Sequence, residues 1–170
     1  MPFFDYGYFS HSKKDDKSNK VKVRRKNLMK NRTVINRIIA NNLDHDFYDG
    51  KRINGYGGFK YDARWKNFLL KIIKRYNLNK KSKVLDIGAK KGFFIKDLCE
   101  MIPGIKVVGI EDHDYPIKKS LHSVRKKIRF VPSYCQIKFK RNEFDFVHAH
   151  NSIYRYSLRD LIRIIKMINI

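Results

Sequence analysis

The sequence predicts an α/β fold in which a mostly parallel sheet is covered by helices on both faces. Four short segments rich in branched apolar residues are typical of strands, and they alternate with segments of helical periodicity. Strands that are apolar on both faces are typical of parallel sheets with helices on each side. With 170 residues, 42% of them hydrophobic, the chain is long and apolar enough for one compact domain.

An amphipathic helix is expected first, over residues 34–43. The apolar residues that share one face of this helix are Val34, Ile35, Ile38, Ile39 and Leu43. Residues 48–62 follow as a loop rich in glycine and tyrosine. Loops of this length inside compact domains are uncommon and tend to be functional or mobile.

The clearest helix is predicted over residues 63–78. Its apolar residues recur at helical spacing, with lysine and arginine opposite: Trp65, Phe68, Leu69, Ile72, Ile73 and Tyr76. A strand is expected at residues 83–87, followed by a glycine-bounded loop. The next helix covers residues 93–102 and stops at Pro103 and Gly104.

The remaining elements complete the alternation. A second strand is expected at residues 106–110, followed by a short helix that ends near Val124, and further strands at 128–131 and 144–150. Ser157 and Asp160 form a capping box before a last helix over residues 158–168. The apolar stripe expected on that helix is Leu158, Leu161, Ile162 and Ile165. No internal repeat is visible.

The net charge of +23 allows two interpretations. Such a charge attracts polyanions such as nucleic acid or an acidic membrane surface. Lysine is abundant together with Asn, Ile, Tyr and Phe, which also fits the codon bias of an AT-rich genome, and the charges are spread along the chain. Residues 1–32 are expected to form a basic flexible arm, either a tether or a solvated tail.

Composition also bears on compartment and metal binding. Cys99 and Cys135 have no Cys or His at ligand spacing, so we expect reduced thiols and no metal site. No window approaches 18 apolar residues, and the N-terminus lacks a hydrophobic signal core. A cytoplasmic protein without a membrane span is therefore expected.

A ligand site is predicted where the first two strands end. Gly88 and Gly92 allow a sharp turn and close approach of a ligand to the backbone. Glu111 and Asp112 follow the second strand, where a carboxylate can accept both ribose hydroxyls of an adenosine. The loop reads G-x-x-x-G and lacks the third glycine of the dinucleotide fingerprint, so its spacing suits S-adenosylmethionine (SAM) better than NAD.

At this point the chain resembles the class I SAM-dependent methyltransferases. Bacterial members read "YGGYKYDGRW", "VLDIGCAKGF" and "GIDISEYAI", and this chain has "YGGFKYDARW" at 56–65, "VLDIGAKKGF" at 84–93 and "GIEDHDYPI" at 109–117. The stretch "FDFVHAHNSIYRY" at 144–156 resembles the fourth-strand motif. The likeness covers residues 53–165 and implies a Rossmann-like three-layer sandwich. Residues 33–62 would then carry a helix and lid loop, and residues 63–170 a partial SAM-binding domain.

The resemblance also implies the residues that bind SAM. The methionine end would be lined by Asp86, Gly88, Ala89, Lys90 and Gly92. Glu111 would hold the ribose, with Asp112, Ser133 and Tyr134 at the adenine and His150 and Asn151 under the sulfonium. The lid would consist of Tyr56, Gly57, Gly58 and Arg64, with Arg64 a candidate partner of the methionine carboxylate. Alternatively, the tyrosine and glycines only make a turn and Arg64 only solvates a helix.

Three departures from the family pattern stand out. Lys90 takes a position that is Gly or Ala in relatives, and a cation beside the sulfonium costs about 1 kcal/mol if solvated. It could instead reach outward or neutralise the methionine carboxylate, and two lysines at a helix start also suit a phosphate. Ser133 follows the third strand, at a position where relatives have an acid or amide that binds the adenine amino group. The sequence ends at Ile170, short of the family's seven-stranded core. The fourth strand would then expose an edge unless a partner or second copy covers it.

The function expected from these observations is methyl transfer from SAM to an unidentified acceptor. Alignment does most of the work in such a reaction, so no catalytic dyad is required. The candidate for a base is His150, with His148 and Tyr154 near it; His148 is interpreted as a core residue and His113 as a surface residue. The alternative is a non-catalytic basic Rossmann-like module that binds nucleic acid.

Overall fold

The computed structural model describes residues 30–168. The chain forms two compact units, Met1–Arg64 and Trp65–Ile170, which we describe separately. The basic arm predicted over residues 1–32 lies almost wholly outside the described residues. Within residues 30–168, no helix combines the length and apolar character needed to cross a bilayer.

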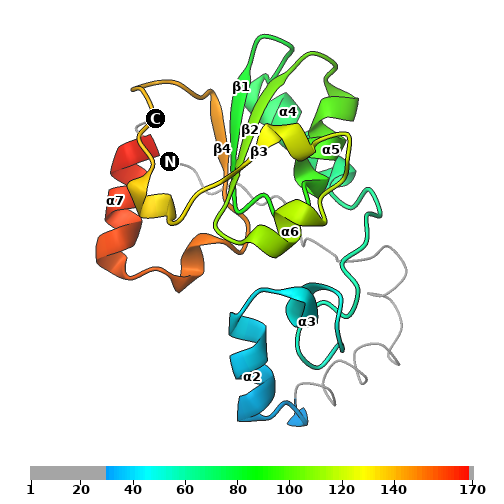
Figure 1. Ribbon diagram of the computed structural model, residues 1–170. Coiled ribbons are helices and arrows are strands. Elements are labelled where there is room, and N and C mark those ends of the chain that lie inside the picture. Colours follow the sequence, from blue (N-terminus) through cyan, green and yellow to red (C-terminus); the bar gives the residue numbers. More distant parts are fainter. Residues whose placement is uncertain (1–29, 169–170) are drawn as a thin grey trace. The chain divides into compact units, whose positions relative to one another are not determined.

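The described part of the first unit consists of two short helices and a loop (Figure 1). The rings of Phe47, Tyr48, Tyr56 and Phe59 form an aromatic cluster in it. Helix α2, Val34–Asn41, begins at a capping box in which Thr33 and Asn36 bind each other's backbone N–H. Helix α3, His45–Tyr48, follows. The predicted amphipathic helix is confirmed as far as Asn41, whereas Leu43 lies beyond its end. Val34, Ile35 and Ile38 of its apolar face are exposed.

The second unit contains a four-stranded sheet in the order β3-β2-β1-β4. All three pairings are parallel, as predicted. The strands are β1 Lys83–Ile87, β2 Lys106–Glu111, β3 Ile128–Phe130 and β4 Phe146–His148. Strand β4 is shorter than the predicted 144–150 and forms one edge of the sheet (Figure 1).

Four α-helices and three 3₁₀ turns accompany these strands in the described part of the second unit. The α-helices are α4 Lys66–Tyr76, α5 Phe93–Met101, α6 Asp114–Lys118 and α7 Leu158–Ile168. The 3₁₀ turns are η1 Arg125–Lys127, η2 Tyr134–Gln136 and η3 Ile153–Arg155. The helix predicted to end near Val124 is therefore α6 alone, which ends at Lys118, followed by a turn in which Ser120 Oγ donates to the Ile117 carbonyl.

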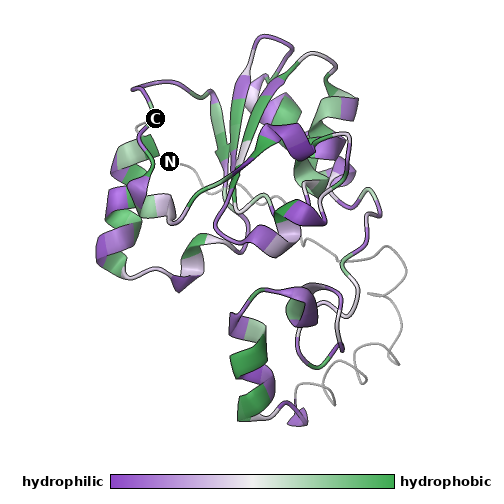
Figure 2. Cartoon of the chain, in the orientation of Figure 1, coloured by the Kyte–Doolittle hydropathy of each residue, from purple (hydrophilic) through white to green (hydrophobic). Residues whose placement is uncertain are grey.

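Both faces of the sheet are covered, as predicted. On one face α4 packs against α5, and the backbone N–H of Trp65 donates to the buried Asp97 Oδ2 at 3.0 Å, which ties the start of α4 to α5. On the other face, η2 and α7 enclose a core cluster that consists of Leu85, Ile87, Ile110, Tyr134, Phe144 and Ile164. Figure 2 shows hydrophobic residues along the strands and hydrophilic residues on the connections.

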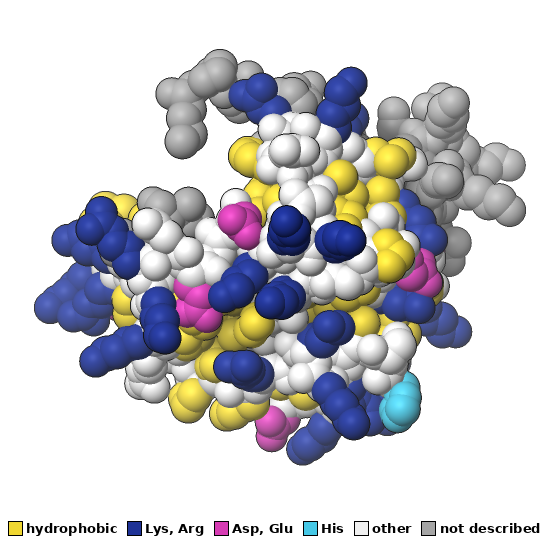
Figure 3. Space-filling view, turned by 90° about the horizontal axis from the view of Figure 1, so that it is seen from above, with side chains coloured by type: hydrophobic (Ala, Val, Ile, Leu, Met, Phe, Trp, Pro, Cys, Tyr) yellow, Lys and Arg dark blue, Asp and Glu magenta, His cyan; other side chains and the backbone are white. Residues whose placement is uncertain are grey.

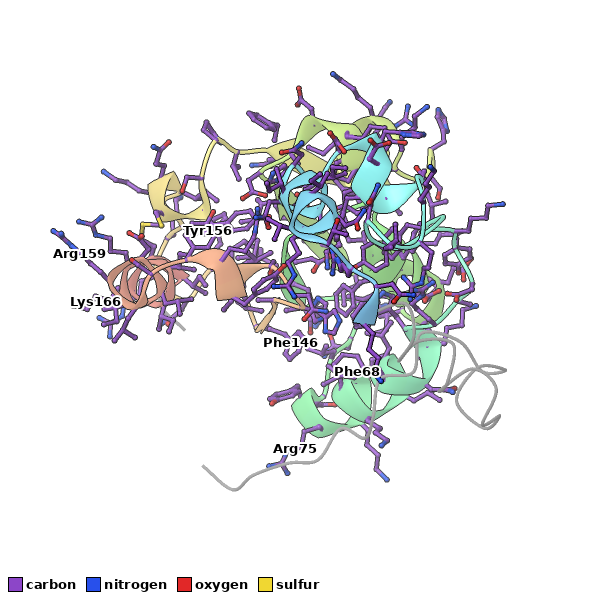
Figure 4. The ribbon with its side chains drawn as sticks, turned by 90° about the horizontal axis from the view of Figure 1, so that it is seen from below. Phe68, Arg75, Phe146, Tyr156, Arg159 and Lys166 are labelled. Atoms are coloured by element: carbon purple, nitrogen blue, oxygen red, sulfur yellow. The ribbon has the colours of Figure 1, made fainter. Side chains whose placement is uncertain are left out.

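Helix α7 buries a different side from the one its pattern suggested. The cap at Ser157 is confirmed, because Ser157 Oγ accepts from the Asp160 N–H at 3.2 Å, and the Ser157 hydroxyl donates to Asp160 Oδ2 at 2.7 Å. Ile164 is buried, whereas Leu158, Ile162 and Ile165 of the expected stripe are exposed. The helix is apolar on two sides, so periodicity alone did not select the side that packs. Arg159 and Lys166 extend from α7 away from the sheet (Figure 4).

The surface carries many cationic side chains. The face shown in Figure 3 has lysine and arginine distributed across it and few acidic residues. This distribution agrees with the spread of the charges along the sequence, since no single basic patch dominates the view.

Candidate functional site

The glycine loop between β1 and α5 is folded as a tight, left-handed turn. Gly88, Lys90 and Gly92 have φ of 75°, 53° and 78°. The N–H groups of Gly88 and Ala89 both donate to the carbonyl of Ile110, at 2.8 and 3.0 Å, which ties the loop to β2. Gly92 caps α5 in the left-handed conformation. A non-glycine residue in this region of φ is strained, so Lys90 stands where glycine is the easier choice.

The segment after β4 packs directly on this loop. A Cβ placed on Gly88 would collide with the Cβ of Ser152, so the space beside this glycine is filled by the chain itself. Ser152 is buried, and its hydroxyl has no hydrogen-bond partner among the described residues. A buried hydroxyl without a partner is costly, and a hydrogen bond from a bound ligand or an ordered water would relieve that cost.

Glu111 ends β2 with its side chain held against the glycine loop. The residue is 2% exposed, and its Oε2 accepts a hydrogen bond from the Lys90 N–H at 2.8 Å. Burial raises the pKa of Glu111, while the contacts with His113 and the Lys90 N–H act in the opposite direction. Glu111, the carboxylate predicted to bind the ribose, therefore lies against the glycine loop.

The side chain of Lys90 lies at the same edge of the sheet. Its Nζ donates to the carbonyl oxygen of His150 at 2.9 Å. Burial lowers the pKa of Lys90, and the negative charges of Glu111 and Asp86 oppose that shift. The Lys90 side chain turns inward to His150, so the alternative in which it reaches outward is wrong.

Asp86 and His148 form a buried pair across β1 and β4. The Asp86 Oδ1 and His148 Nδ1 lie 2.7 Å apart, and a hydrogen bond between them requires the proton on Nδ1. The imidazole stacks on Phe94 with a centroid distance of 3.9 Å. Trp65 meets the same ring edge-on. His148 is therefore a core residue, in agreement with its interpretation from the sequence.

His150 and Asn151 follow β4 at the rim of the site. His150 is half-buried, with its ring 5.1 Å from that of Trp65 and parallel to that of His148. Asn151 is exposed and lies 3.2 Å from the His150 Nε2. Its φ of 49° places it in the left-handed region.

Asp112 is the centre of a polar network that the sequence did not predict. Its carboxylate accepts from the hydroxyls of Tyr134 and Tyr156, at 3.1 and 3.2 Å, and from the guanidinium of Arg155 at 3.1 Å. His113 Nδ1 lies 2.6 Å from the same carboxylate. The predicted adenine contact of Asp112 would therefore have to share this carboxylate with residues near the start of α7.

The charges of this network shift two pKa values strongly. Hydrogen bonds to Asp112 and Glu111 raise the pKa of His113 to about 9, and the pKa of Asp112 falls to about 2 despite its burial. Side-chain ligand atoms of Glu111, Asp112 and His113 lie within 4.8 Å of one another. In this structure His113 and Asp112 of this cluster form an ion pair, with His113 Nδ1 2.6 Å from Asp112 Oδ1.

The two residues predicted at the adenine edge after β3 both serve the fold. Ser133 caps η2, its hydroxyl accepting from the Cys135 N–H at 3.2 Å. Tyr134 is 2% exposed and belongs to the core cluster, and burial raises the pKa of its hydroxyl.

The predicted lid residues belong to the first unit. Tyr56 packs on Phe59 with a centroid distance of 4.2 Å, and Gly57 and Gly58 both have positive φ. Arg64 Nε pairs with Asp62 Oδ1 at 2.7 Å, and its guanidinium lies over the Phe59 ring. These contacts fold the loop locally; the lid and carboxylate roles stay predictions.

Comparison with known proteins gives a fold. No family model and no curated protein matches the chain. Among solved structures, a Haemonchus contortus phosphoethanolamine N-methyltransferase in complex with S-adenosyl-L-methionine aligns with a TM-score of 0.52 and 21% identity, over 81% of this chain and 34% of that one. A SAM-dependent methyltransferase from Clostridium acetobutylicum aligns with a TM-score of 0.51 and 15% identity, over 73% and 48%. A putative SAM-dependent methyltransferase from Methanococcus maripaludis aligns with a TM-score of 0.51 and 15% identity, over 96% of this chain and 63% of that one.

The chain has the fold of these methyltransferases. Identities of 15–21% support the fold alone, a Rossmann-like α/β arrangement whose sheet is smaller than the seven-stranded core. The chain spans 47%, 45% and 63% of the lengths of the first three solved structures that it matches. The activity of those proteins therefore enters below as a proposal.

Proposed function

We propose that this chain binds S-adenosylmethionine at the carboxyl ends of β1, β2 and β4 and transfers its methyl group to an unidentified acceptor. The observation that carries the proposal is Glu111, a buried carboxylate at the end of β2 that lies against a glycine loop in a methyltransferase fold. In open α/β sheets, ligands bind outside the carboxyl ends of the strands, which is where this carboxylate lies.

The residues at this edge fit most of such a ligand. Glu111 supplies two carboxylate oxygens for the ribose hydroxyls, and the unpartnered hydroxyl of Ser152 supplies a donor and acceptor beside the glycine loop. Asp86 lies near the end of β1, close to the same loop, and its carboxylate is oriented by the contact with His148. Lys90 is the one group whose charge opposes a sulfonium, and its contact with His150 therefore has to change when the ligand binds.

The chemistry needs little from the protein beyond positioning. When bound, SAM supplies a methyl group on a sulfonium that is already a good leaving group. Glu111 would fix the adenosine end, while the packed rings of Trp65, His148 and His150 would exclude water from the rim. His150 is half-buried there and is our candidate to accept the acceptor's proton, if the acceptor carries one.

The test is calorimetric titration of the protein with S-adenosylhomocysteine. Glu111→Gln should weaken binding by about 10- to 100-fold, since hydrogen bonds to a charged group contribute about 1.5–3 kcal/mol. Glu143→Gln is the matched control, because Glu143 also accepts from a lysine backbone N–H, that of Lys140 at 2.9 Å, outside the site. Binding that is absent in the wild type at millimolar ligand, or equal in both variants, would overturn the proposal.

A second candidate is a nucleic-acid-binding module. The net charge of +23 and the cationic face of Figure 3 favour it, because phosphate contacts supply most of the non-specific affinity for nucleic acid. Binding to unrelated oligonucleotides should then fall steeply with salt and weaken when residues 11–32 are deleted. Indifference to oligonucleotides at low salt would reject this candidate.

A further inference from the structure

The segment that follows β4 crosses the carboxyl edge of the sheet. The strand order is β3-β2-β1-β4, so a chain that leaves β4 in this direction passes the end of β1 before it reaches the end of β2. Residues 150–156, which we call the strap, follow this course. The first residues of the strap contact the glycine loop after β1, and its last residues contact Asp112 after β2. The strap therefore lies along the edge where the ligand is proposed to bind.

The start of the strap is held against the glycine loop. The carbonyl oxygen of His150 accepts a hydrogen bond from Lys90 Nζ at 2.9 Å. Ser152 fills the space beside Gly88, since a Cβ placed on that glycine would collide with the Ser152 side chain. The close approach that a glycine at this position offers to a ligand is thus used by the chain itself.

The end of the strap is held by the carboxylate of Asp112. The Arg155 guanidinium donates to both oxygens of Asp112, at 3.3 and 3.1 Å. The Tyr156 hydroxyl donates to the same carboxylate at 3.2 Å and accepts from the Tyr134 N–H at 3.3 Å. Hydrogen bonds to an ionised acceptor are stronger than those between neutral groups, so Asp112 is the main anchor of the strap.

We infer that the strap closes the ligand site in this conformation and has to lift from the sheet edge before the ligand binds. The inference rests on the proposed function, because that function supplies the ligand. Gly88, Lys90 and Asp112 are all contacted by the strap, and the resemblance implies the same residues as contacts of SAM. The strap and the ligand therefore compete for one set of groups, while Glu111 keeps its proposed role at the ribose.

The closed position of the strap carries two costs that lifting relieves. Ser152 is 4% exposed, and its hydroxyl has no hydrogen-bond partner among the described residues. Water satisfies this hydroxyl once the strap lifts. Asn151 has a φ of 49°, in the left-handed region that costs energy for any residue except glycine. The anchor at Asp112 opposes both costs, so the balance between the closed and open positions depends on that anchor.

The alternative is that the strap stays in place and forms a permanent wall of the ligand site. The burial of Ser152 argues against this alternative, because its Oγ is closed off from solvent and a ligand reaches it only after the strap has moved. The filled space beside Gly88 argues in the same direction.

A double variant, Arg155→Ala with Tyr156→Phe, removes the strap's hydrogen bonds to Asp112. We expect it to fold, because the Arg155 side chain is 28% exposed and phenylalanine keeps the ring that packs 5.7 Å from that of Tyr134. Arg163→Ala is the matched control. It also removes one arginine from an ion pair with an aspartate, but that partner is Asp160 on α7, at 3.4 Å.

The experiment combines two measurements on each protein. The first is hydrogen exchange of the backbone amides of residues 150–156 without ligand, and the second is calorimetric titration with S-adenosylhomocysteine. In the double variant we expect exchange over the strap to become about 10-fold faster or more, with β1 and β2 unchanged. We expect S-adenosylhomocysteine to bind about 10-fold tighter or more, because a larger fraction of the protein has an open site. Arg163→Ala should match the wild type in both measurements.

Three results would overturn the inference. Tighter binding with unchanged exchange over the strap would mean that the freed Asp112 binds the ligand directly. Faster exchange with equal or weaker binding would mean that the strap does not compete with the ligand. Both of these results leave the proposed function standing, whereas absence of binding in every variant at millimolar ligand removes the proposed function as well.

Discussion

The ion pair between His113 and Asp112 predicts a pH dependence of stability. The pKa of His113 rises from 6.5 to about 9 in the folded protein, so its stabilisation is complete below pH 6.5 and is lost as the pH rises through about 9. Such a rise corresponds to at most about 3.4 kcal/mol, and solvent around the partly exposed ring reduces the expected value to about 1–2 kcal/mol. The lowered pKa of Asp112 acts at acidic pH. The stability that its carboxylate contributes is lost as the pH falls below 3.8 and through about 2.

The perturbation is Asp112→Asn, and the assay is urea unfolding at about pH 6 and about pH 10. The variant should be less stable than the wild type at both values, because Tyr134, Tyr156 and Arg155 lose a charged acceptor. The difference in free energy of unfolding between the wild type and the variant should be about 1–2 kcal/mol smaller at the higher pH, where His113 is neutral in both proteins. A difference that does not change between the two pH values would refute this reasoning, as would an NMR titration of His113 in the wild type with an ordinary midpoint.

Two further predictions concern packing. Gly109→Ala places a Cβ 2.6 Å from Ile95 Cδ1 and 2.9 Å from the Ala89 Cβ, so it should destabilise the protein by about 1–3 kcal/mol in urea unfolding; a neutral result would mean that α5 shifts freely on β2. Ile164→Ala should cost about 2–5 kcal/mol because Ile164 is 2% exposed in the core. Ile165→Ala should change stability by less than about 0.5 kcal/mol because Ile165 is 63% exposed, and equal effects of the two substitutions would contradict the orientation of α7.

The sequence predicted the order of elements because their signals are local. The four strands, their parallel pairing and the helices that cover both faces follow from apolar runs and periodicity within short windows. The cap at Ser157 was equally local and is confirmed. The packed side of α7 was missed because Leu158 and Ile164 are both apolar, and only the position of the sheet decides which of them is buried.

The candidate site was predictable in part for the same reason. Motifs placed Glu111 and the glycine loop at the same edge of the sheet, because the loop follows β1 and Glu111 ends β2. The partners of Asp112 were not predictable, because Arg155 and Tyr156 lie more than forty residues away and no spacing rule links them. The direction of the Lys90 side chain was left open in the sequence because it depends on the position of the His150 carbonyl after β4.

The close contact between Gly88 and Ser152 couples two positions that are far apart in the chain. During synthesis the turn after β1 emerges long before Ser152, so Gly88 stays uncovered until the segment after β4 has been made. Homologous chains with a larger residue at one position should carry a smaller one at the other, and directed evolution of this loop would have to vary the two codons together.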